Sequence, residues 1–82
     1  MKLIYSREAA RGISKIPPKT KLRIKHGIEE LLTKPLLGKP LKGELSEYRR
    51  TRIGGYRIIY RFEKKSQTII IDNVGPRGDV YK

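Results

Sequence analysis

Arginines and tyrosines are concentrated in the stretch 48–62, and these side chains are well suited to binding a phosphate. Gly54-Gly55 divides the stretch and predicts a two-residue hairpin turn, because both turn positions need a positive φ. Such a turn fixes the register of the two strands. One face of the hairpin then carries Tyr48, Arg50, Arg52, Arg57 and Arg61. Like charges that face each other destabilise a sheet, so this face indicates a polyanionic partner.

The other face of the hairpin is largely apolar. The same register places Ile53 opposite Tyr56, Thr51 opposite Ile58, and Arg49 opposite Tyr60. We expect this face to pack on the core, with both tyrosines inside and the arginine at the rim.

Residue types on the basic side favour single-stranded RNA as the partner. Guanidinium groups bind phosphate bidentately and keep their charge, and a tyrosine can stack on a base or bond a phosphate. If the last strand pairs with 56–62, Arg77 lies just past its end and Tyr81 follows within a short turn. Lys39 and Lys42 lie in the preceding loop and extend the candidate set.

Cleavage of the RNA is a further possibility, because RNA carries its own nucleophile, the 2′-OH. Arginines can stabilise the charge that develops on the phosphate. The proton-transfer roles are harder to assign, since carboxylates are few and none is expected on the basic face. A tyrosine, or a lysine whose pKa is depressed by neighbouring positive charge, could act as the base. Residue types therefore predict RNA binding and leave cleavage open.

Composition supports a polyanion-binding domain. The 82 residues predict one domain, and 20 Lys and Arg against 8 Asp and Glu give a net charge of +12. This charge suits nucleic acid, an anionic membrane or an acidic protein. No cysteine is present and His26 is the only histidine, which argues against disulfides and against thiolate or multi-histidine metal sites. A chain this short leaves no room for a cofactor domain, so we expect no cofactor. We expect no membrane association and a cytoplasmic location, because no apolar run resembles a signal peptide or a membrane span.

Two helices should follow a first strand at 2–5. Ser6 is a reasonable N-cap for a helix ending near Lys15 or Ile16, and Pro17-Pro18 stops it. Pro18 can begin a second helix that runs to about Thr33, so the two helices form an αα-hairpin. The apolar stripes of the two helices comprise Ala9, Ile13, Ile16, Ile24, Ile28, Leu31 and Leu32.

The remaining segments complete an α+β fold. We expect 34–43 to be a loop fastened to the core by Leu36, Leu37 and Leu41. Residues 44–47 lead into the hairpin. A last strand, 67–74, has an unbroken apolar run typical of a strand buried on both faces, and the segment 75–78 should end it. The predicted order is an N-terminal strand, a two-helix hairpin, then a three-stranded antiparallel meander with both helices packed on one face of the sheet.

Several segments of this chain together resemble the RelE/ParE superfamily of bacterial and archaeal toxins. The family shows a Leu-Lys-Gly-x-Leu segment, a basic strand, Gly-x-Tyr-Arg-Ile/Val-Ile-Tyr, and a Gly-x-Arg segment followed by a near-terminal tyrosine. The matching segments here are Leu41-Lys42-Gly43, Arg50 with Arg52, Gly54-Gly55-Tyr56-Arg57, Gly75-Pro76-Arg77, and Tyr81. The resemblance covers essentially the whole chain.

The resemblance implies a toxin of a type II toxin–antitoxin pair with a RelE-like fold. RelE-type members cleave mRNA in the ribosomal A site without a metal. By motif match, Arg57 and Arg77 correspond to phosphate-stabilising arginines, and Tyr81 to a tyrosine that stacks on the substrate or assists proton transfer. Arg50 and Arg52 stand where the family has basic strand residues, often lysines. The other substrate-binding residues implied are Tyr48, Lys42 and Arg61.

One departure from the family concerns the general base that would take the proton of the 2′-OH. Many relatives have a histidine in the Gly-x-Arg segment, where this chain has Pro76. Arginine also stays protonated where the family has lysine. The general base therefore remains open among Tyr48, Tyr81 and Lys42.

Two other functions are compatible with the same resemblance. One is a ParE-like toxin that inhibits DNA gyrase without cleaving RNA, although those relatives typically lack the full arginine and tyrosine set. The other is an inactive member that only binds RNA or its antitoxin. In either toxin reading we expect a small acidic antitoxin as partner, by charge complementarity.

Overall fold

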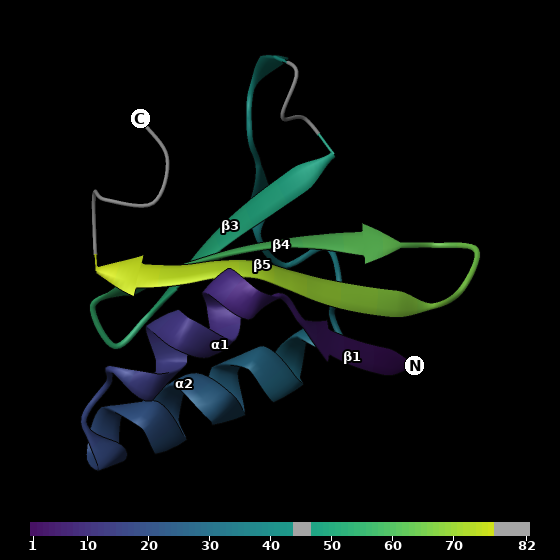
Figure 1. Ribbon diagram of the computed structural model, residues 1–82. Helices are drawn as coiled ribbons and strands as arrows, with labels where there is room; N and C mark the ends of the chain where they lie inside the picture. Colours follow the sequence, from purple (N-terminus) through teal and green to yellow (C-terminus); the bar gives the residue numbers. More distant parts are fainter. Residues whose placement is uncertain (44–46, 77–82) are drawn as a thin grey trace.

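The computed structural model describes residues 1–43 and 47–76 and places two helices on one face of a single five-stranded sheet (Figure 1). The elements follow the order β1 (Lys2–Tyr5), α1 (Arg7–Ser14), α2 (Pro18–Leu31), β2 (Lys39–Pro40), β3 (Tyr48–Ile53), β4 (Tyr56–Glu63) and β5 (Thr68–Pro76). In the sheet the strand order is β1-β5-β4-β3-β2. The expected α+β fold is confirmed, with one strand more than predicted.

Local signals in the sequence set both helices. The Ser6 side chain caps α1 by accepting a hydrogen bond from the Ala9 N–H at 3.0 Å. Its hydroxyl also donates to the Asp72 carbonyl at 2.6 Å, which ties the start of α1 to β5. Helix α2 begins at Pro18, as expected, and each helix ends one or two residues earlier than predicted.

The hairpin of β3 and β4 has the predicted register at every pair. Gly54 and Gly55 both have a positive φ, 56° and 83°, as the tight turn requires. The pairs are Tyr48 with Arg61, Arg49 with Tyr60, Arg50 with Ile59, Thr51 with Ile58, Arg52 with Arg57, and Ile53 with Tyr56. Two faces of opposite character therefore lie back to back, as the sequence predicts.

Strand β5 lies inside the sheet, antiparallel to β4 and parallel to β1. A register shift between Ile59 and Tyr60 leaves Asp72 as an extra residue on β5. The prediction that 75–78 ends the strand was wrong for its first two residues, because Gly75 and Pro76 still pair with β4. Strand β1 pairs with β5 only as far as Ile71, so the other edge of β5 near Pro76 has no partner among the described strands and tolerates a residue without an N–H.

Polar contacts fasten the loop after α2, and two of the three leucines expected to fasten it are exposed. Leu36 and Leu37 are 61% and 49% exposed, which contradicts the expectation that they fasten the loop, and Leu41 is half-buried. Instead, the buried hydroxyl of Tyr60 accepts from the Gly38 N–H at 2.8 Å and donates to the Pro35 carbonyl at 2.9 Å. The loop also contains β2, which pairs with β3 and was not predicted.

The core lies between the helices and the sheet. It comprises Ala9, Ile16, Ile24, Ile28, Leu31, Ile58, Tyr60, Ile69, Ile71 and Val74. Tyr56 and Ile53 are half-buried against it, so the assignment of the apolar hairpin face to the core is confirmed. Neither helix within residues 1–43 and 47–76 has the length and apolar character needed to cross a bilayer.

Candidate functional site

The basic face of the sheet is the side that α1 and α2 leave uncovered (Figure 1). Arg52 on β3 and Arg57 on β4 are direct cross-strand partners one pair away from the Gly54-Gly55 turn. Lys39 on β2 pairs with Arg50, which adds a sixth side chain to this side of the sheet. We use the term basic face for Tyr48, Arg50, Arg52, Arg57 and Arg61 together with Lys39.

Two arginines of the basic face are partly withdrawn from water. Arg57 and Arg61 flank Ile59 on β4, and Ile59 is only 1% exposed. The Nε atoms of both arginines are buried, and neither has a hydrogen-bond partner within the described part of the chain. A buried donor without a partner costs about 1–3 kcal/mol, and more when it is charged. An anionic ligand that reached these groups would offset that cost.

The basic face ends in a cleft at the β2 side of the sheet. It has a volume of about 440 Å³ and is lined by Leu37, Lys39, Arg50, Thr51 and Arg52. Three of these five residues are cationic. The cleft therefore combines positive charge with one exposed apolar side chain.

The remaining predicted site residues are placed less centrally or not at all. Tyr48 is half-buried at the start of β3, opposite Arg61. Lys42 is exposed and comes just after Leu41, whose N–H donates to the Tyr48 carbonyl. Arg77 and Tyr81 lie outside the described residues, and their roles stay predictions.

One carboxylate falls on the basic side, contrary to expectation. Strand β4 continues to Glu63, one residue further than predicted, and strand alternation places Glu63 on the same side as Arg61. Its side chain is exposed at the far end of the strand. Within the described residues, no three His, Cys, Asp or Glu side chains form a group able to hold a metal ion.

Sequence reasoning included the loop lysines Lys39 and Lys42 in this site but missed Leu37 and Tyr60. Leu37 was assigned to the core, and Tyr60 was assigned only an apolar role. Tyr60 has a raised pKa, chiefly because it is buried, while the Gly38 hydrogen bond and the charge of Arg49 act in the opposite direction. Its neutral hydroxyl holds the loop segment that forms one wall of the cleft. The tyrosine at a core position was the available signal, because a buried hydroxyl needs hydrogen-bond partners.

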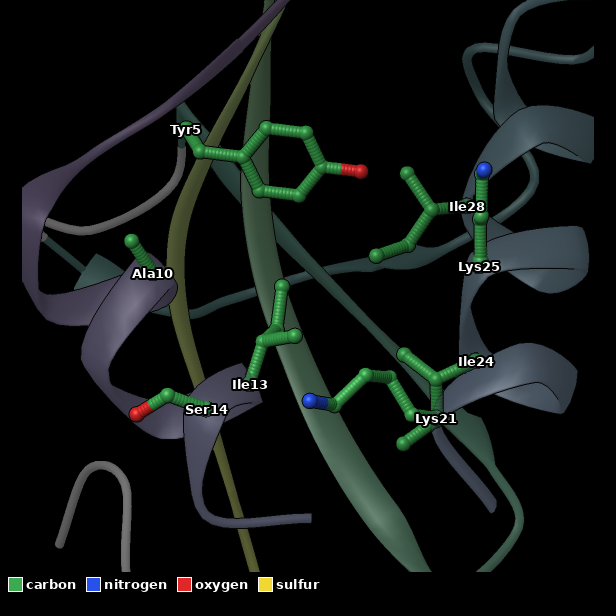
Figure 2. Close-up of a pocket in the computed structure, with 8 residues that line it drawn as sticks. All are labelled: Tyr5, Ala10, Ile13, Ser14, Lys21, Ile24, Lys25 and Ile28. Atoms are coloured by element: carbon green, nitrogen blue, oxygen red, sulfur yellow. The ribbon is translucent and has the colours of Figure 1, made fainter. Parts of the chain in front are cut away.

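A second cavity lies on the opposite layer of the molecule, between the two helices (Figure 2). Figure 2 shows Ile13 of α1 and Tyr5 of β1 on one side, and Ile24 and Ile28 of α2 on the other. Its volume is about 490 Å³, and most of its lining is apolar. Burial, followed by the charge of Glu29, raises the pKa of Tyr5. This groove has no residue in common with the basic face.

Known proteins share both the fold and the sequence of this chain. A structure of the toxin–antitoxin complex RelBE2 from Mycobacterium tuberculosis superposes with a TM-score of 0.82 and 31% identity, covering 93% of this chain and 96% of that one. The isolated RelE toxin of E. coli superposes with a TM-score of 0.81 at 21% identity, covering 98% and 89%, which supports the fold alone. The fold is thus that of the RelE-type toxins.

Sequence comparison identifies the family. Residues 3–81 match the family model described as the ParE toxin of type II toxin–antitoxin systems, parDE. The curated Toxin RelG of Mycobacterium tuberculosis is 32% identical over 80 residues, which are 95% of this chain and 92% of that protein. This chain belongs to the RelE/ParE superfamily of toxins of type II toxin–antitoxin systems.

Proposed function

We propose that this toxin is an endoribonuclease that cleaves mRNA in the ribosomal A site, with the RNA 2′-OH as nucleophile and no metal. The observation that carries the proposal is the pairing of Arg52 with Arg57 on a face that neither helix covers, together with the buried Nε of Arg57, which has no hydrogen-bond partner among residues 1–43 and 47–76. A structural arginine pair would call for a carboxylate between the two side chains. A phosphodiester supplies the matching negative charge.

The arginines would act on the phosphate during in-line displacement. The 2′-oxygen forms a bond to phosphorus, the bond from phosphorus to the 5′-oxygen breaks, and a 2′,3′-cyclic phosphate and a 5′-hydroxyl result. Negative charge grows on the non-bridging oxygens of the pentacoordinate phosphate. Guanidinium groups fixed by the sheet stabilise that charge without rearranging, and such stabilisation is usually the largest catalytic contribution. We assign this role to Arg57, with Arg50 and, by family resemblance, Arg77.

Two proton transfers complete the reaction. One group takes the proton of the 2′-OH, and another gives a proton to the departing 5′-oxygen. The candidates for these roles are Tyr48, Lys42 and Tyr81. Arg52 and Arg61 are assigned to holding the RNA backbone on either side of the cleaved bond.

An antitoxin partner follows from the family. Relatives of the same fold have been solved as complexes with antitoxins, including RelBE2 of Mycobacterium tuberculosis and RelBE of E. coli. A net charge of +12 favours a small acidic partner. We propose that this toxin binds such an antitoxin in the cell.

Expression in growing cells tests the nuclease directly. Wild type should arrest growth, and primer extension should map cuts within codons of translated messages. Arg57→Ala should abolish the cuts, whereas Arg23→Ala on the exposed side of α2 should leave them. Arrested growth with intact transcripts would refute the nuclease assignment.

Inhibition of DNA gyrase is the second candidate function. It is favoured by the match to a family described by its ParE toxins. A supercoiling assay with purified toxin and gyrase separates the two activities, because a nuclease should leave supercoiling unchanged. A protein that neither cuts transcripts nor slows growth would instead be an inactive member.

A further inference from the structure

The cleft at the β2 end of the basic face is built around one short strand pair. Strand β2 pairs with β3 only through Lys39 and Pro40. The cleft opens beside this pair, with Leu37 and Lys39 on the loop side and residues 50–52 of β3 on the other. Its volume of about 440 Å³ is in the range of small-ligand pockets.

Buried polar contacts hold the loop wall of this cleft in place. The Tyr60 hydroxyl bonds both Pro35 and Gly38, and the Arg49 Nη1 donates to the Gly38 carbonyl at 2.8 Å. A Cβ added at Gly38 would lie 2.6 Å from the Arg50 carbonyl oxygen, so the loop backbone presses directly on β3. Lys39 is the next residue, and its position therefore depends on these contacts.

The chemistry of the lining suits a nucleotide. Lys39, Arg50 and Arg52 supply positive charge, and none of the five lining residues is acidic. Leu37 is 49% exposed beside these cations, where its apolar surface can contact the face of a base. A free phosphate would use only the cations and leave this side chain in water.

This cleft adjoins the proposed cleavage position, because Arg50 lines the cleft and is also assigned to the cleaved phosphate. Two strand spacings, about 10 Å, lie between Lys39 on β2 and Arg57 on β4. A strand of RNA that crosses the sheet would bring one phosphate to Arg57 and the next one along to Lys39, with Arg50 between them.

We propose that this cleft is a subsite for an RNA nucleotide beyond the cleaved bond, with Lys39 on its phosphate and Leu37 on its base. Tyr60 is a positioning residue for this subsite. The proposal rests on the proposed function, because it takes single-stranded RNA as the substrate.

The test measures binding of 2′-O-methyl oligonucleotides, which lack the nucleophile and are not cut. A dinucleotide and a pentanucleotide are titrated over a salt series against wild type, Lys39→Gln and the control Lys65→Gln, an exposed lysine in the β4–β5 turn. Lys39→Gln should weaken binding of the pentanucleotide. It should also reduce the slope of log affinity against log salt concentration by about 0.7, the value of one phosphate contact on a single strand. It should leave the dinucleotide unchanged, and Lys65→Gln should change neither.

A double-mutant cycle tests the positioning role. Tyr60→Phe should weaken binding of the pentanucleotide and leave binding of the dinucleotide unchanged. A general loss of folding would weaken both. Because both substitutions act on one subsite, the effect of Lys39→Gln should shrink in the Tyr60→Phe background.

The outcomes separate this inference from the proposed function. If wild type binds neither oligonucleotide at any salt while primer extension still maps cuts, the subsite is refuted and the nuclease assignment stands; if the cuts are absent as well, both proposals fail. If wild type binds both and Lys39→Gln acts like Lys65→Gln, the subsite is refuted while the nuclease assignment stands. If Lys39→Gln weakens only an acidic protein partner, the cleft is a protein-binding surface and the subsite is overturned.

Discussion

Arg52 and Arg57 are direct cross-strand partners near the hairpin turn, on a sheet face that no described helix covers. Like charges in this position oppose folding, so the fold carries a cost at the place where a phosphate would remove it. Stability and function should therefore respond in opposite directions to substitutions here.

Arg57→Met keeps an apolar stem of similar length and removes the charge. We expect the free energy of unfolding to rise by about 0.5 kcal/mol, because the repulsion with Arg52 disappears. Cleavage of mRNA should fall by about 10²–10³-fold, the usual loss when one donor to the transition state is removed. Urea unfolding and a primer-extension time course measure the two quantities. A variant that is both less stable and fully active would contradict this account.

Tyr60→Phe should destabilise the fold by about 1–2 kcal/mol, because it leaves the Gly38 N–H and the Pro35 carbonyl without their partner. The matched comparison is Leu36→Ala in the same loop, which should cost less than about 0.5 kcal/mol because this side chain is exposed. Chemical denaturation gives both values. The reverse order would mean that the leucines hold the loop after all.

Tyr60 also predicts the response of the fold to alkali. Burial is the main cause that raises its pKa above the ordinary value of about 10. Above pH 10 the unfolded chain loses this proton before the folded protein does, so stability present at lower pH is lost as pH rises through the raised pKa. Wild type should lose stability more steeply above pH 10 than Tyr60→Phe, as followed by thermal unfolding at a series of pH values. Parallel curves would show that the hydroxyl titrates alike in both states.

Ile28 and Leu22 test the assignment of the two sides of α2. Ile28 is fully buried and Leu22 is 57% exposed. Ile28→Ala should cost about 2–5 kcal/mol through lost burial and a cavity, and Leu22→Ala less than about 0.5 kcal/mol. Equal losses would mean that α2 packs on the sheet through a different side.

The parts of the fold that follow from neighbouring residues could be predicted from the sequence. Gly54-Gly55 sets the hairpin register without help from the rest of the chain. Ser6 likewise marks the start of α1 through its side-chain cap, and Pro18 marks the start of α2 because the first helical residue needs no N–H. The basic face was predictable for the same reason, since its residues alternate along the two strands of that hairpin.

The parts that depend on distant residues could not be predicted in the same way. Strand β2 has only two residues and exists because β3 pairs with it. Pro76 stays in β5 because β4 lies alongside while the other edge is unpaired among the described strands. The apolar loop leucines predicted that the loop packs on the core through them. Instead, the Tyr60 hydroxyl bonds the loop backbone and determines where the loop lies. Arg77 and Tyr81 lie outside the described residues, so their place in the candidate site rests on the sequence pattern and the family resemblance.

The parallel pairing of Leu3 on β1 with Ile69 on β5 has a consequence for how the chain folds. More than sixty residues separate the two strands, so this pair raises the contact order of the fold, which slows folding. Until residues 68–76 are synthesised, β1 and α1 lack the strand they pack on, and Arg57 lacks its neighbour Gly75. A nascent chain that stops before β5 therefore carries Arg50, Arg52 and Arg57 without the neighbouring strand, and we expect phosphate binding to require the addition of β5.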